Sequence, residues 1–91
     1  MDNLIFIDVL TFSNKAYIQV YKAGMNMGVS CSLGELAQKV ANLSATYGIN
    51  NIQISGSNKF LQKYVEDIHA ENKKNYANFN LKIEVIPVWN I

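Results

Sequence analysis

Four consecutive residues, Ser55-Gly56-Ser57-Asn58, have the composition of an anion-binding turn. They connect a short apolar run that ends at Ser55 to a helical pattern that begins at about Asn58. Free backbone N–H groups and the helix dipole make a helix N-terminus a favourable place for an anion. However, one glycine with no following Lys-Ser or Lys-Thr does not match a phosphate-binding loop. The segment therefore indicates either an anion site or an ordinary capped turn.

Two carboxylates also occupy positions at which they could do chemistry. Asp8 interrupts the apolar run of residues 4–10, and Glu35 opens an amphipathic helix. A carboxylate buried without a partner costs on the order of several kcal/mol, so we expect Asp8 to be hydrogen-bonded or exposed at the strand end. Tyr17 and Tyr21 are the expected partners. Ser32 and Glu35 match a capping box, in which each side chain binds a free backbone N–H of the first helical turn.

The single histidine and the single cysteine lack catalytic partners in the sequence. His69 has no second histidine and no nucleophile beside it, so we expect it to face solvent on a helix. Cys31 precedes a helix N-terminus, a place that lowers thiol pKa values, but no resolving cysteine or base accompanies it. We interpret it as a small apolar residue at a strand end. One cysteine allows no internal disulfide, which fits a reducing cytoplasm.

Hydrophobic periodicity predicts seven elements that position these residues. The run 4–10 is apolar on both faces and predicts a central strand covered on both sides. A second strand follows over 16–22, and a third is predicted over 25–31, where Gly28 weakens the strand or marks a bulge. The remaining elements are a helix ending at Gly48, a strand over 51–55, a helix that Gly56-Ser57-Asn58 opens and that reaches about Tyr76, and a strand over 81–86. The pattern predicts one α/β domain over residues 1–91, built on a single mixed sheet.

Composition narrows the classes of function. The chain has 91 residues, 49% of them hydrophobic and 16% charged, with a net charge of +1. No block of like charge is present to attract nucleic acid or an anionic membrane, and all eight basic residues are lysine, which removes the guanidinium fork used in base recognition. No apolar stretch reaches the ~18 residues of a membrane span. We expect a cytoplasmic, soluble protein.

The element order β-β-β-α-β-α-β resembles the minimal core of the ribonuclease H-like superfamily. The resemblance covers residues 4–86 and implies a central first strand, with the meander on one side and two parallel crossover strands on the other. Nucleases of this superfamily hold two Mg²⁺ or Mn²⁺ ions with converging carboxylates. Asp8 matches the first of these positions and Glu35 the second, whereas the fourth strand ends in Ser55-Gly56-Ser57, where the resemblance implies an acid. The incomplete set favours a non-catalytic member without a cofactor, and a metal-dependent nuclease or nucleic-acid-binding protein is the alternative.

Large amphipathic side chains are numerous for a chain of this size, and Tyr, Trp and Met are enriched at protein interfaces. The predicted interface comprises Tyr17, Tyr21, Met25, Met27, Trp89 and Ile91. These residues either complete a small core or dock on a protein partner or a second copy, and an open third strand could pair with its copy. The function we predict is a small intracellular interaction module, in keeping with an accessory protein of a bacteriophage or mobile element.

Overall fold

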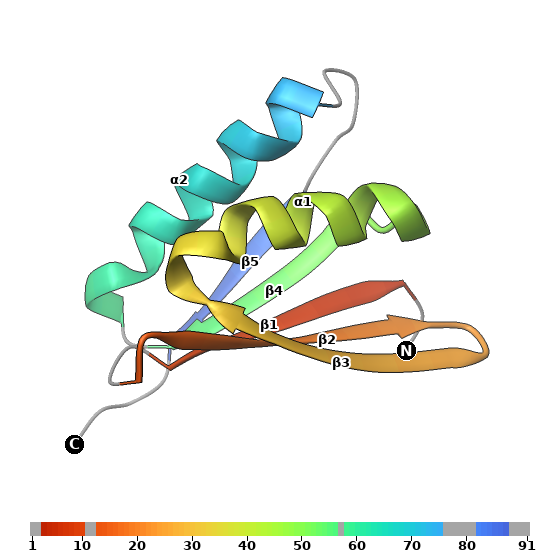
Figure 1. Cartoon of the computed structure of the whole chain (residues 1–91), viewed down its shortest axis with the longest axis horizontal. Coiled ribbons are helices and arrows are strands. Elements are labelled where there is room, and N and C mark those ends of the chain that lie inside the picture. The colour runs from red at the N-terminus through yellow and green to blue at the C-terminus, as the bar shows by residue number, and fades with distance from the viewer. Residues whose placement is uncertain (1–2, 11–12, 57, 76–81, 88–91) are drawn as a thin grey trace.

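The fold is a five-stranded sheet with two α-helices, seen in a computed structural model that describes residues 3–10, 13–56, 58–75 and 82–87 (Figure 1). The strands are β1 (Leu4–Leu10), β2 (Lys15–Lys22), β3 (Met25–Ser32), β4 (Asn51–Gly56) and β5 (Lys82–Pro87). The helices are the short 3₁₀ turn η2 (Leu33–Glu35), α1 (Leu36–Tyr47) and α2 (Asn58–Asn75). All seven predicted elements are therefore confirmed.

The strand order is β3-β2-β1-β4-β5, with β1 in the centre. Antiparallel pairing joins β1 to β2 and β2 to β3, while β1–β4 and β4–β5 are parallel. This order matches the ribonuclease H-like core, as the element sequence predicted. Strand β3 pairs with β2 over eight consecutive residue pairs, from Lys15 opposite Ser32 to Lys22 opposite Met25, so Gly28 marks no bulge.

Both helices lie on the same face of the sheet (Figure 1). The two crossovers, β3-α1-β4 and β4-α2-β5, run in the same direction across the sheet. Because such crossovers are right-handed, two that run the same way place their helices on the same side. The expectation that β1 is covered on both sides is therefore wrong for the described residues, whose two α-helices leave the other face free of helices.

The core lies between this helix-covered face and the two helices. Alternate residues of the inner strands are buried there because successive side chains of a strand point to opposite faces. The helices contribute residues at helical spacing. The buried apolar set includes Ile5, Ile7, Val9, Ala16, Ile18, Val20, Leu36, Val40, Ile52, Ile54, Leu61 and Ile68.

The ends of α1 depart partly from the predicted pattern. Ser32 makes no side-chain bond to a backbone N–H; its hydroxyl instead donates to the Glu35 carboxylate at 2.9 Å. The capping box is therefore wrong, because a 3₁₀ turn separates Ser32 from the first α-helical residue. At the other end Gly48 ends the helix in the left-handed conformation (φ 65°), as predicted. In the described part of the chain, neither α-helix is both long and apolar enough to cross a membrane.

Candidate functional site

Along β1, β2 and β4, the helix-free face of the sheet carries three adjacent rows of side chains around its centre, which follow from the strand register. Residues opposite one another in paired strands share a face, so Phe6, Gln19 and Gln53 form the middle row. Asp8 and its two neighbours, Tyr17 and Ser55, form the next row, and Leu4 with Tyr21 forms the third. We use the name helix-free face for these eight residues: Leu4, Phe6, Asp8, Tyr17, Gln19, Tyr21, Gln53 and Ser55.

A shallow groove of about 440 Å³ lies in the centre of this face, and its lining mixes apolar and amide groups. Leu4, Phe6 and Tyr21 supply apolar surface, while Gln19 and Gln53 supply the amides. The Tyr21 hydroxyl donates to Gln19 Oε1 at 2.9 Å, which orients that amide and leaves its NH₂ group free to donate. A second hollow, of about 380 Å³, adjoins the groove and extends toward β5. Such a surface can accept an apolar side chain and hydrogen-bond its backbone.

Tyr17 is the most exposed aromatic residue of this face, with 43% of its surface accessible. Its ring extends across β3, where its hydroxyl occupies the space that a Cβ on residue 28 would need. Gly28 therefore allows Tyr17 to lie against β3 instead of pointing straight into solvent. This close approach explains why Gly28 lies in the middle of a regular strand. From the sequence, we interpreted this glycine as a weakness of the strand or a bulge.

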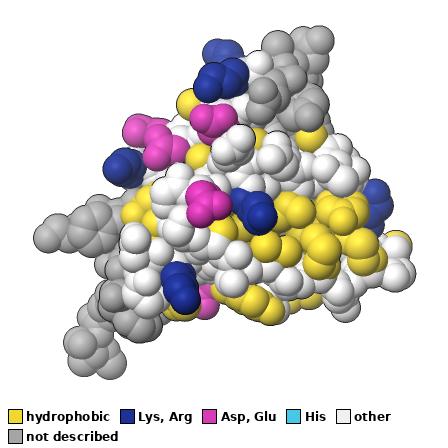
Figure 2. All heavy atoms as spheres, viewed as in Figure 1, with side chains coloured by type: hydrophobic (Ala, Val, Ile, Leu, Met, Phe, Trp, Pro, Cys, Tyr) yellow, Lys and Arg dark blue, Asp and Glu magenta, His cyan; other side chains and the backbone are white. Residues whose placement is uncertain are grey.

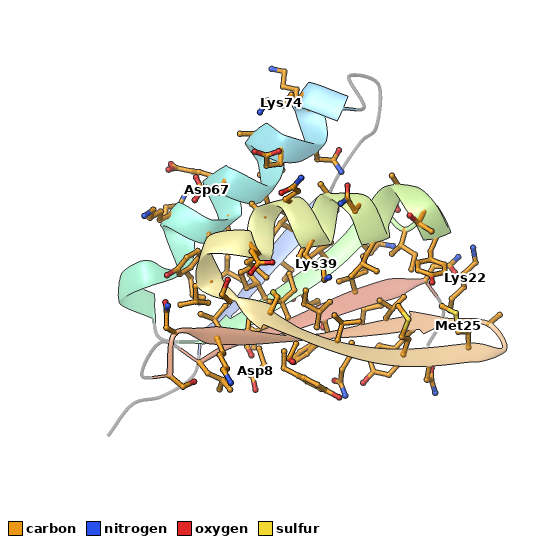
Figure 3. The ribbon with its side chains drawn as sticks, viewed as in Figure 1. Asp8, Lys22, Met25, Lys39, Asp67 and Lys74 are labelled. Carbon is orange, nitrogen blue, oxygen red and sulfur yellow. The ribbon has the colours of Figure 1, made fainter. Side chains whose placement is uncertain are left out.

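Asp8 lies on the helix-free face, below the sheet in Figure 3, whereas the helices lie above it. It is half-buried, and the hydroxyl of Ser55 approaches its Oδ1 atom at 3.5 Å. The predicted partners were Tyr17 and Tyr21, and neither bonds to it among the described contacts: Tyr17 turns toward Gly28, and the Tyr21 hydroxyl binds Gln19. The carboxylate partner therefore comes from β4, the parallel neighbour of β1.

The second carboxylate of the proposed metal pair, Glu35, is exposed in the turn that leads from β3 into α1, where it accepts a hydrogen bond from Ser32. Asp8 projects from the opposite face to the one on which α1 packs. Among the described residues, no three His, Cys, Asp or Glu side chains come together in a group that could hold a metal ion. The structure thus does not bring Asp8 and Glu35 into a shared acidic cluster.

At Ser55 and Gly56, the predicted anion site is filled by contacts within the protein. Ser55 is 6% exposed and directs its hydroxyl at the Asp8 carboxylate, while Gly56 is pressed against Val9 and Leu61. Asn58 is the first residue of α2, and Ser57 lies outside the described residues. A hydroxyl already directed at a carboxylate is poorly placed to receive a second anion. Anion binding here stays a prediction.

Cys31 is half-buried and packs against the core from β3, as expected of an apolar strand-end residue. Burial raises the pKa of its thiol, and the nearby Glu35 charge raises it further, while Lys39 acts in the opposite direction. A thiol with a raised pKa is a weak nucleophile at neutral pH, because the thiolate is the reactive form. His69 is exposed on α2, as predicted.

The predicted interface residues divide between two surfaces. Tyr17 and Tyr21 lie on the helix-free face, but Met25 and Met27 alternate to the opposite side, where they pack half-buried against the core at the β3 edge. Trp89 and Ile91 lie outside the described residues. The sequence analysis missed Phe6, Gln19 and Gln53; their two-residue spacing from Asp8, Tyr17 and Ser55 is the signal that places them on the same face.

No protein-family model matches the sequence, and a search of functionally curated proteins found no match.

Proposed function

We propose that this protein is an interaction module that binds another protein through its helix-free face, and that it is a non-catalytic member of the ribonuclease H-like superfamily. The observation that carries the proposal is the groove of about 440 Å³ on that face, with Phe6 and Tyr21 beside two half-buried glutamines. Aromatic residues are enriched in protein–protein interfaces, and tyrosine is among the residues that most often contribute a large share of the binding energy.

The chemistry of the groove favours a polypeptide partner. Aromatic and aliphatic walls accept an apolar side chain. The Gln53 amide offers donors and an acceptor that match a peptide backbone, and Gln19, whose Oε1 accepts from Tyr21, offers its NH₂ donors. The eight residues of the face include one carboxylate, Asp8, and the adjoining hollow is lined by a second, Glu84, together with Lys82. Two carboxylates against one lysine beside the groove oppose the phosphate backbone of a nucleic acid, which supports a protein over a polynucleotide.

Site-specific photo-crosslinking tests this proposal. A photoreactive amino acid replaces Gln53 in the groove or, as a matched control, Gln62 on the exposed surface of α2. In extract of the source cells, we expect a discrete protein adduct from position 53 that is absent from position 62. Competition by the unlabelled wild-type protein should remove the adduct, and a Phe6→Ser competitor with native-like circular dichroism should not. Adducts of equal yield at both positions would refute the helix-free face as the binding surface.

The alternative function for a protein with this fold is that of a metal-dependent nuclease. Calorimetric titration with Mg²⁺ and Mn²⁺, together with cleavage assays on single- and double-stranded substrates, tests it directly. Because Asp8 and Glu35 do not share a cluster, we expect neither metal binding nor cleavage. Metal binding that Asp8→Asn abolishes would overturn the proposal, as would an adduct of position 53 with nucleic acid.

A further inference from the structure

The two edges of the sheet differ in how they are protected against pairing with another strand. Edge strand β5 carries Lys82, Glu84 and a terminal Pro87, which are the devices that natural edges use to prevent association. Edge strand β3, with the sequence Met-Asn-Met-Gly-Val-Ser-Cys-Ser, has no charge, no proline and no bulge over eight paired residues. Within the described chain, nothing pairs with its outer backbone groups.

An apolar band borders this unprotected edge on the helix side. In Figure 2, which views the molecule from the β3 edge, hydrophobic side chains gather between β3 and the C-terminal half of α1. Met27 receives a hydrogen bond from the Tyr47 hydroxyl at 3.9 Å, and Lys22 donates to the Tyr47 carbonyl at 2.7 Å. These contacts hold the end of α1 against the β2–β3 hairpin, so the band is ordered before any partner arrives.

We propose that β3 pairs with β3 of a second copy of this chain, antiparallel and about a twofold axis, to form a ten-stranded sheet. Identical uncharged edges meet without like-charge repulsion, and antiparallel pairing of a strand with itself generates the twofold symmetry that most homodimers have. This inference uses a different surface from the groove of the helix-free face and does not depend on it. The axis stands perpendicular to the sheet, so both helix-free faces lie on the same side of the dimer.

The alternation of side chains restricts the register of this pairing. Opposed residues of antiparallel strands share a face, so the axis must pass through a residue and not between two residues. An axis at Gly28 places Met27 opposite Val29 of the second copy and Met25 opposite Cys31, which gives apolar pairs throughout the helix side. An axis at Val29 would pair fewer apolar residues.

The position of Tyr17 also favours an axis at Gly28. The Tyr17 hydroxyl already lies over Gly28, so the rings of the two copies would approach each other across the axis. That contact would cover an aromatic side chain that is 43% exposed in one copy. On the same face, Asn26 would lie opposite Ser30 of the second copy, an amide–hydroxyl pair.

Light scattering of the purified protein tests the dimer. We expect wild-type protein to have twice the 10.2 kDa mass of one chain. Val29→Lys introduces a charge on the helix side of β3, and we expect it to reduce the mass to one chain at the same concentration. Val85→Lys is the control, since Val85 is also a valine on the helix side of an edge strand, here β5, although it is 39% exposed and Val29 is half-buried; it should stay dimeric. A wild-type monomer at millimolar concentration, or a dimeric Val29→Lys protein with native circular dichroism, overturns the proposal.

Disulfide trapping tests the register. In a Cys31→Ser background, Asn26→Cys/Ser30→Cys should give covalent dimers on oxidation, because opposed cross-strand residues lie within disulfide range. The two positions cannot bridge within one strand, since four residues span about 13 Å. An axis at Val29 would instead place residue 26 opposite residue 32, so Asn26→Cys/Ser32→Cys would form covalent dimers in that register. Faster trapping of that variant would refute the Gly28 axis, and absence of trapping in both would refute edge pairing.

Discussion

Replacing Gly56 with alanine should destabilise the protein far more than a surface Gly→Ala change. Gly56 has φ 155°, and an added Cβ would lie 3.0 Å from the Val9 carbonyl oxygen and 3.2 Å from Leu61 Cδ2. The backbone conformation costs alanine about 1–3 kcal/mol. Overpacking against a backbone oxygen and a buried leucine adds about 1–3 kcal/mol. We therefore expect a loss of about 2–6 kcal/mol from a domain stability of about 5–15 kcal/mol.

Thermal and urea unfolding followed by circular dichroism measures this loss. A decrease of 2 kcal/mol corresponds to a fall in Tm of at least about 8 °C for a domain of this size. Gly34→Ala is the control, because an added Cβ there meets nothing within 4 Å, and its stability should stay within about 1 kcal/mol of wild type. Equal stabilities of the two variants would refute the close approach of β4 to β1 and α2 at Gly56.

Three further variants test separate contacts. Ser44→Ala removes the 2.5 Å hydrogen bond from the buried hydroxyl to the Ile49 carbonyl and should cost about 1–3 kcal/mol in urea unfolding, since the carbonyl loses a partner; no loss would contradict that bond. The raised pKa of Cys31 predicts that its thiol is alkylated slowly at neutral pH, and that alkylation accelerates at a more alkaline pH in the folded protein than in the unfolded chain. The stability that the neutral thiol contributes is lost as pH rises through its folded pKa. Equal pH profiles of alkylation with and without denaturant would contradict this. Gly28→Ala should displace the Tyr17 ring, visible as a shift of its NMR resonances, at little cost in stability because the ring end is free to move; an unchanged ring environment would contradict the contact.

The element order and strand pairing were predictable because they depend on local patterns and on a handedness rule. Alternation in residues 16–22 and 25–31 and the Gly48 terminus each act within a few neighbouring residues, and all three are confirmed. The two-sided cover of β1 was predicted wrongly for a specific reason. Phe6 and Leu10 are apolar, yet the shared direction of the crossovers leaves their face without helices.

The details of the site depend on register, which the sequence pattern did not resolve. The Asp8 partner is Ser55, 47 positions away, and a parallel pairing between β1 and β4 is required to bring them together. Likewise, Ser44 was not expected in the core, since its burial depends on the Ile49 carbonyl that accepts its hydrogen bond. The role of Gly28 follows only when the tyrosine on the neighbouring strand is placed.

Helices on a single side of the sheet separate the residues that pack the core from those that the proposed function assigns to a partner. Under that proposal, substitutions at positions such as Gln19 and Gln53 change what is bound while leaving the packed layer of isoleucines untouched. Across descendants of this gene, the inward-pointing half of each strand should therefore vary slowly and the outward half quickly. The same division makes the domain a practical scaffold for selecting new specificities, because a library confined to outward positions would consist mostly of folded proteins.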